Sequence, residues 1–138
     1  MRFMMIVKAT QDSEAGIMPG EELISAMAKY HEELHKAGVL LDGSGLQPSS
    51  KGWRVKCSGA KRRIIDGPFA ETKELLAGYT LIQVKTREEA MDWAMRFPNP
   101  AVDGKEGEIE VRQLFEIEDF GGSDAAERFR NMDLVSQK

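Results

Sequence analysis

The order of the predicted elements indicates an α+β fold of the ferredoxin-like βαββαβ type, with an extra β-hairpin inserted before its second half. Two observations support this prediction. Apolar residues recur at helical spacing in residues 21–37 and 87–97. Around and between these segments, apolar residues alternate at strand spacing. A length of 138 residues fits one domain with a core of its own.

The first half begins with a strand and a helix. Residues 3–9 read as a strand that is apolar on both of its alternating faces. Residues 11–20 form a polar loop that ends in Pro19-Gly20, and a helix follows over residues 21–37. Gly38 stands where a helix ends, and the apolar stripe of the helix consists of Leu23, Met27, Tyr30 and Leu34.

The middle of the chain is predicted to be strands and turns. A strand that begins at residues 39–41 is broken by Asp42-Gly43-Ser44-Gly45. Residues 53–57 and 62–65 form a hairpin around Ser58-Gly59-Ala60. Residues 78–85 make a further strand.

The second half repeats the helix and strand. Thr86 and Glu89 have the spacing of a capping box, and Pro98 ends the helix that they open. Residues 108–117 show the clearest alternation in the chain and form the last strand. We expect the domain to cover residues 1–120, followed by a tail, residues 121–138, with a short helix over 123–135.

The sheet needs a cover on both faces. The two helices of a βαββαβ unit lie on one face, whereas Met4 and Ile6 of the first strand point to the other. Leu114 likewise interrupts the polar face of the last strand. A second copy of the chain is the simplest cover, with two sheets back to back. The sequence therefore predicts a homodimer.

Composition narrows the partners and the compartment. A net charge of −4 leaves no basic face for the phosphates of a duplex, so no nucleic-acid partner is expected. No apolar run approaches the ~20 residues of a membrane span, and the start resembles no signal segment. We therefore expect no membrane contact and a cytoplasmic protein. Cys57 reads as a small buried apolar side chain, with a reactive thiol as the alternative.

The densest group of candidate functional residues is the stretch from Asp66 to Glu74, DGPFAETKE. Pro68 imposes a turn, so Asp66 ends a strand, where it could act as a general base or a polar substrate contact. Glu71 and Lys73 would then form the rim of a cleft. A turn closed by an Asx hydrogen bond from Asp66, with a solvated rim, also explains these residues.

Residues 66–74 resemble the DGPF signature of the YCII-related family. The resemblance extends over roughly residues 1–120, and its further landmarks are Lys8-Ala9, Ser13-Glu14-Ala15-Gly16, Ala37-Gly38-Val39-Leu40-Leu41, Gly45-Leu46-Gln47-Pro48, Ala77-Gly78-Tyr79, Glu89-Ala90 and Glu108-Ile109-Glu110-Val111-Arg112. The resemblance implies a dimeric α+β barrel built from ferredoxin-like subunits. It implies no settled substrate.

The resemblance also concerns a histidine. Members of the wider family are proposed to use a His–Asp pair, with the His on the first helix. The corresponding position in this sequence holds Met27, and His31 lies one turn further along a similar face. His31 is thus a candidate displaced acid–base group. A partly exposed histidine on a helix face is the alternative.

Two cations complete the candidate site. Lys8 either reaches solvent or brings positive charge to a cleft beside Asp66. Arg112 either pairs with Glu110 or provides a fork for a substrate carboxylate.

His31 and His35 have i,i+4 spacing, but no further ligand completes a metal site. We therefore expect neither a metal nor a cofactor.

Together these residues predict a site for a small molecule on a dimeric protein. We expect Lys8 and Arg112 to hold a small polar or carboxylated metabolite, and Asp66 to transfer a proton in a cofactor-independent step of the isomerase or lyase type. Glu71 and Lys73 would line the rim. The alternative is a non-catalytic dimeric module that senses a ligand or assists a transcription regulator.

Overall fold

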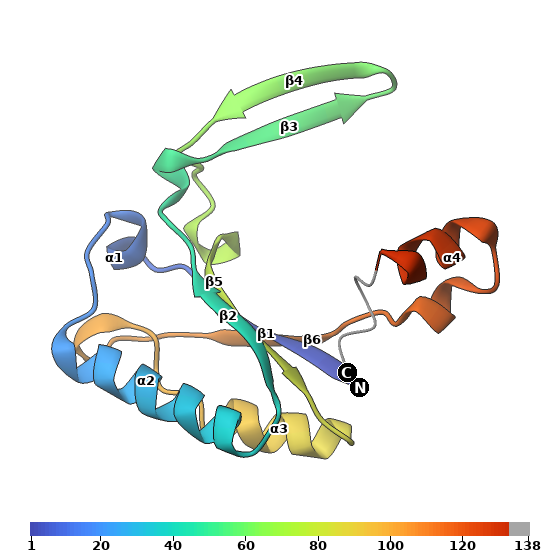
Figure 1. Ribbon diagram of the computed structural model, residues 1–138. Helices are drawn as coiled ribbons and strands as arrows, with labels where there is room; N and C mark the ends of the chain where they lie inside the picture. Colours follow the sequence, from blue (N-terminus) through green and yellow to red (C-terminus); the bar gives the residue numbers. More distant parts are fainter. Residues whose placement is uncertain (133–138) are drawn as a thin grey trace.

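The computed structural model describes residues 1–132 and contains an antiparallel four-stranded sheet and a separate two-stranded hairpin (Figure 1). The sheet has the strand order β2-β5-β1-β6. Its strands are β1 (Arg2–Lys8), β2 (Leu40–Gly45), β5 (Leu76–Gln83) and β6 (Ile109–Gln113), and the hairpin consists of β3 (Trp53–Ser58) and β4 (Lys61–Asp66). The predicted α+β fold is confirmed, and this strand order is compatible with a ferredoxin-like plan.

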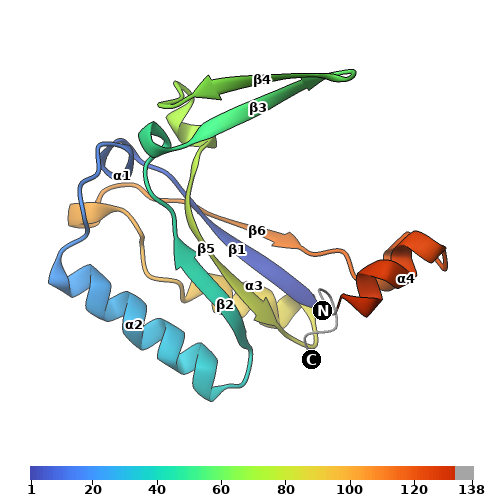
Figure 2. The ribbon, with the colours of Figure 1, turned by 45° about the horizontal axis from the view of Figure 1, so that its top comes forward.

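Two long helices lie on the same face of the sheet (Figures 1 and 2). The helices of the chain are α1 (Gln11–Glu14), α2 (Glu21–Lys36), α3 (Arg87–Met95) and α4 (Asp124–Asn131), and α2 and α3 are the two that cover the sheet. Four single 3-10 turns join other elements: η1 (Ser49–Lys51), η2 (Thr72–Glu74), η3 (Val102–Gly104) and η4 (Ile117–Phe120). None of the helices among residues 1–132 is long and apolar enough to cross a membrane.

The core fills the layer between the two helices and the sheet. Met5, Leu34 and Ile82 are completely buried there. Burial of a side chain of this size stabilises the folded state by roughly 1.5–3 kcal/mol. The cluster comprises Phe3, Met5, Tyr30, Leu34, Val39, Ile82, Val84 and Ala90.

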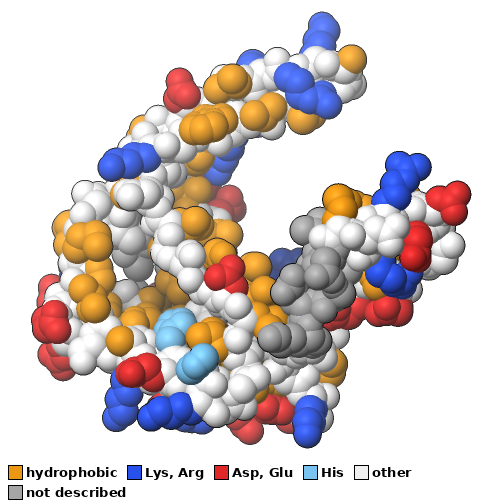
Figure 3. Space-filling view, in the orientation of Figure 1, with side chains coloured by type: hydrophobic (Ala, Val, Ile, Leu, Met, Phe, Trp, Pro, Cys, Tyr) orange, Lys and Arg blue, Asp and Glu red, His pale blue; other side chains and the backbone are white. Residues whose placement is uncertain are grey.

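The opposite face of the sheet is open. Met4 and Ile6 of β1 are half-buried and lie beside Leu81 and Tyr79 of β5 in the sheet register. The hairpin and α4 stand away from this face at separate places, with a deep hollow between them (Figure 3). Strand β1 therefore has apolar side chains on both faces, as predicted, whereas the long helices cover one face of the sheet.

Three elements differ from their predicted extents for a clear physical reason. The polar loop before α2 contains the one-turn helix α1, because Thr10 and Ser13 cap it through reciprocal hydrogen bonds. Strand β2 continues through Gly45 with an irregularity after Leu40, since pairing with β5 overrides the poor strand propensity of residues 42–45. Strand β6 ends at Gln113, so the predicted strand over 108–117 was too long.

The predicted C-terminal helix is present as α4. Ser123 caps it by accepting a hydrogen bond from the Ala126 amide. Residues 133–135 of the predicted helix lie outside the described residues.

A hydrogen bond to the main chain fixes Tyr30 in the core. The Tyr30 hydroxyl donates to the Trp93 carbonyl oxygen at 2.6 Å, which ties α2 to α3. The rings of Trp93 and Phe97 lie against the Tyr30 ring. Burial raises the pKa of the Tyr30 phenol above its ordinary value, and the nearby Arg96 opposes this shift only in part.

Close backbone contact at the base of the hairpin requires glycine at position 67. The Gly67 amide donates to the Gly52 carbonyl oxygen at 2.9 Å, so residues 66–69 lie against the turn at residues 49–52. A Cβ atom at Gly67 would collide with the Ser49 carbonyl oxygen. No side chain fits this space unless the backbone moves.

Replacement of Tyr30 by Phe should destabilise the protein by about 1 kcal/mol, because the Trp93 carbonyl loses the hydroxyl donor and keeps the Arg96 amide. The raised pKa also predicts a pH effect. Stability due to the neutral phenol is present below the unfolded pKa of about 10 and is lost as pH rises above it. Urea unfolding of both proteins between about pH 8 and pH 11 measures this difference. Equal slopes of stability against pH in the two proteins would contradict the prediction.

Replacement of Gly67 by Ala should cost about 1–3 kcal/mol of stability, as expected of a side chain forced into filled space. Gly122→Ala is the matched control, because a Cβ atom at Gly122 meets no atom within 4 Å. The control should stay within about 0.5 kcal/mol of the wild type in chemical denaturation. A Gly67→Ala protein as stable as the control would show that the turn does not pack as described.

Candidate functional site

A shallow pocket of about 310 Å³ opens at the base of the hairpin. Its walls are mostly apolar, and two basic side chains belong to its lining. The lining includes Leu46, Pro48, Lys51, Arg54, Phe69 and Leu76. Two of the sequence landmarks, residues 45–48 and residues 66–74, thus meet at one place in the fold.

Ser49 joins the segments that form this pocket. Its amide donates to a Glu14 carboxylate oxygen at 3.0 Å, and its hydroxyl donates to the other oxygen of the same carboxylate. The Ser49 hydroxyl oxygen also accepts the Phe69 amide at 3.1 Å. Hydrogen bonds to a charged acceptor are about twice as strong as neutral ones. Glu14 of α1 therefore fixes both the turn after β2 and the loop after β4.

Arg54 brings positive charge to the pocket. Its guanidinium carbon lies 3.8 Å from the centroid of the Phe69 ring, a cation–π arrangement. The nearest Glu71 carboxylate oxygen is 3.9 Å away, at the limit of an ion pair. The Arg54 side chain is 44% exposed, so its N–H groups are accessible from the pocket.

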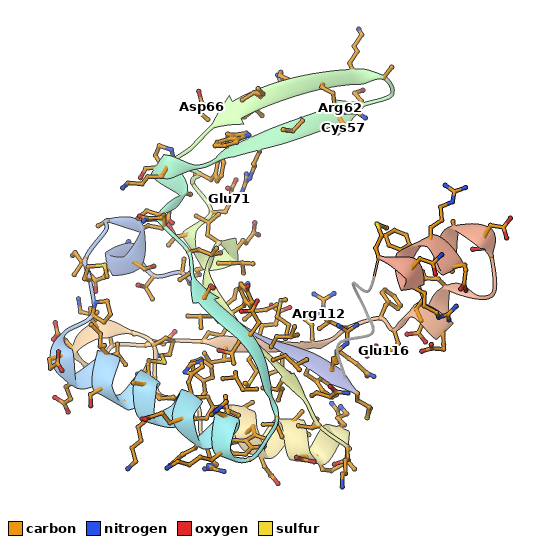
Figure 4. All side chains as sticks on the ribbon, viewed as in Figure 1. Cys57, Arg62, Asp66, Glu71, Arg112 and Glu116 are labelled. Atoms are coloured by element: carbon orange, nitrogen blue, oxygen red, sulfur yellow. The ribbon has the colours of Figure 1, made fainter. Side chains whose placement is uncertain are left out.

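A second group of charges lies on the open face of the sheet. Glu110 pairs with Lys8 at 3.5 Å and with Arg112 at 3.2 Å. The hydrogen bond from Arg112 and the attraction of Lys8 lower the pKa of the Glu110 carboxyl group, although partial desolvation opposes them. Arg112 reaches toward the hollow (Figure 4). Lys8 is the register partner of Leu76, which lines the pocket, so this cluster adjoins the pocket.

Asp66 does not face the pocket. It ends β4 and is exposed, and its side chain forms no hydrogen bond or ion pair with any described residue. In the hairpin register it shares a face with Trp53, whereas Arg54 points to the other face. Figure 4 shows Asp66 on the outer side of the hairpin, and Glu71 lies below it. No Asx hydrogen bond closes the turn, so that alternative is wrong for this residue.

His31 lies on the other side of the sheet, between α2 and the strands. Its Nδ1 is 2.8 Å from the Met27 carbonyl oxygen and its Nε2 is 2.8 Å from the Thr80 hydroxyl. Because a carbonyl oxygen only accepts, Nδ1 carries a proton, and Nε2 of a neutral ring accepts from Thr80. The structure does not bring His31 and Asp66 together. Their predicted acid–base roles stay predictions.

The two predicted rim residues occupy the loop that follows the hairpin. Glu71 approaches Arg54, as described above, whereas Lys73 is exposed in η2 and forms no ion pair with a described residue. Among residues 1–132, no group of three or more His, Cys, Asp and Glu side chains is arranged to hold a metal ion.

The sequence interpretation missed Arg54, Lys51 and Ser49. One signal was available in the sequence. The landmark at residues 45–48 directly precedes these residues, and no functional role was assigned to it from the sequence.

Cys57, expected to be buried, is exposed on the hairpin. The hairpin is a separate two-stranded sheet, and the four-stranded sheet does not cover it.

Comparison with known proteins places the chain in a family. The family model for the YCII-related domain matches residues 1–118, which contain the whole sheet and the hairpin. An uncharacterised protein of Rhizobium meliloti (strain 1021) is 34% identical over 91 residues, covering 66% of this chain and 69% of that protein. The match to the family model confirms the predicted membership of this family. The chain belongs to the YCII-related family.

Proposed function

We propose that this protein binds a small carboxylated metabolite with an apolar portion, in the pocket at the base of the hairpin. The observation that carries this proposal is the Arg54 guanidinium, held on the Phe69 ring beside apolar walls. A guanidinium offers a planar fork of N–H donors that matches a carboxylate. Stacking on Phe69 limits the motion of the side chain, so less entropy is lost when a ligand binds.

The size and composition of the pocket support a small ligand. Its volume of about 310 Å³ is at the lower end of the range for small-molecule sites. The apolar side chains of Leu46 and Leu76 are 50% and 44% exposed, and a ligand would remove them from water. Lys51 adds a second cation to the lining. The neighbouring cluster of Lys8, Glu110 and Arg112 extends the polar surface into the hollow.

Binding has more support than catalysis. An acid–base step of the isomerase or lyase type would use Asp66, which points away from Arg54, or His31, which is hydrogen-bonded between helix and sheet. We therefore favour the non-catalytic alternative, a dimeric module that senses a ligand. Asp66 remains the predicted catalytic group, and the Asp66→Asn variant tests it.

The open face of the sheet supports the proposal of a homodimer. Met4, Ile6, Tyr79 and Leu81 form an apolar strip there, half-buried in one copy. Sheets that pack face to face cover such strips with each other's side chains. A second copy on this face would give the dimeric α+β barrel that the family resemblance implies, and would close the hollow beside the pocket.

The binding proposal predicts that hexanoate binds and that hexanol, its neutral counterpart, binds more weakly. Arg54→Gln should weaken hexanoate binding about tenfold or more, because a charge-assisted hydrogen bond contributes roughly 1.5–3 kcal/mol. Arg63→Gln is the matched control: it removes the same charge from the hairpin outside the pocket lining. Asp66→Asn should leave binding unchanged. Calorimetric titration or amide chemical shifts provide the measurement.

Two results would contradict the binding proposal. One is hexanoate binding that is equally weak in wild type, Arg54→Gln and Arg63→Gln. The other is hexanoate binding that is abolished by Asp66→Asn and unchanged by Arg54→Gln. That result would place the site on the outer side of the hairpin and would favour the catalytic alternative.

The dimer proposal predicts a mass of two chains by light scattering at micromolar concentration. Leu81→Glu should yield monomers, because an unpaired buried charge costs about 3–5 kcal/mol, equivalent to a dissociation constant at least about a hundredfold higher. Met95→Glu, at an 86% exposed position of α3, should remain dimeric. A monomeric wild type would refute the proposal.

A further inference from the structure

The hairpin is the basic element of an acidic protein. Residues 51–66 carry six of the 19 Lys and Arg residues and one of the 23 Asp and Glu residues. The expectation that the protein has no basic face is therefore wrong for this element. The remainder of the chain is correspondingly more acidic than the net charge of −4 suggests.

The two faces of the hairpin differ in character. Cross-strand partners share a face, so Val55 and Ile64 lie together and Trp53 follows on the same side. These three side chains are 51%, 67% and 64% exposed, respectively. The other face carries the basic side chains Arg54, Lys56, Lys61 and Arg63. A two-stranded hairpin is at best marginally stable in water without a further packing partner.

The C-terminal segment, residues 115–132, presents the opposite chemistry. Residues 115–132 contain five acidic and two basic residues, and Arg130 pairs with Glu118 and Glu127 of the same copy. Glu116 pairs with Arg2, so Asp119 and Asp124 are the carboxylates of this segment that form no ion pair with a described residue. Phe115 and Phe120 form a ring pair with centroids 5.3 Å apart and are 69% and 59% exposed. Phe129 and Met132 add apolar side chains that are 49% and 57% exposed. The segment therefore combines acidic groups with an uncovered apolar surface.

We propose that the hairpin of one copy packs on the C-terminal segment of a second copy. This proposal rests on the homodimer proposed above and names a contact that holds it together. Trp53, Val55 and Ile64 would cover the phenylalanines of the segment, and Arg62, which shares this face through its pairing with Cys57, would meet its carboxylates. Lys56 and Arg63 on the other face would add attraction at longer range. Opposite charges speed encounter and fix the register of such a contact.

Other partners fit these two surfaces less well. Within one copy, the hairpin and α4 lie on either side of the hollow, so they do not cover each other (Figures 1 and 3). A nucleic acid would neutralise the basic side chains but would leave Trp53, Val55 and Ile64 uncovered. A second copy supplies both the acidic and the apolar groups that this hairpin lacks.

Cys57 provides a direct test, since it is exposed and is the only cysteine of the chain. A tagged wild-type chain is mixed with an untagged Cys57→Ser, Ala125→Cys chain, so that each chain carries one thiol. After subunit exchange and treatment with a short bismaleimide, we expect a cross-linked pair of one tagged and one untagged chain. The control replaces Ala125→Cys by Ser25→Cys, at an exposed position of α2, and should give no such pair.

Charge reversal provides a second measurement. Lys56→Glu with Arg63→Glu should weaken the dimer about tenfold or more, and Glu118→Lys with Asp124→Lys in the partner chain should restore a mixed dimer. A dimer that forms no cross-link and is insensitive to these changes would overturn this contact but leave the homodimer intact. A monomeric wild type would refute both. Variants that stay dimeric but lose binding to heparin would assign the hairpin to a polyanion.

Discussion

The dominant constraint in this structure is a central strand with apolar side chains on both faces, in a sheet whose helices cover one face. Phe3 and Met5 of β1 enter the core, whereas Met4 and Ile6 point to the open side. Apolar surface is costly to leave in water, so the open face favours a covering partner. The hairpin and α4 both stand off the body, where a covering partner would meet them.

The pocket depends on contacts between segments that are distant in sequence. Glu14 holds Ser49, Ser49 holds the Phe69 amide, and the Phe69 ring supports Arg54. Each hydrogen bond in this series joins Ser49 to a carboxylate or to a main-chain amide. The pocket is consequently built at the junction of the sheet and the hairpin.

Local patterns predicted most of the fold. Periodicity located the long helices and the hairpin because these elements depend on neighbouring residues. It failed at residues 42–45, where pairing with β5 overrides the propensities of Asp, Gly and Ser. The site was harder to predict. Arg54 contacts Phe69 only in the folded hairpin, where the two residues come together from distant positions in the sequence. His31 faces Thr80 because its position around the axis of α2 directs the side chain to the sheet.

The hairpin has the proportions of a lever whose base lies at the pocket. Each of its strands has six residues and is about 20 Å long, while its base is held by the contacts of Ser49, Gly52 and Gly67. A rotation of about 10° at this base moves the tip by about 3–4 Å, close to the spacing of one residue along a strand. A change in the pocket that rotated the base by this angle would thus be enlarged at the tip into a shift of about one residue.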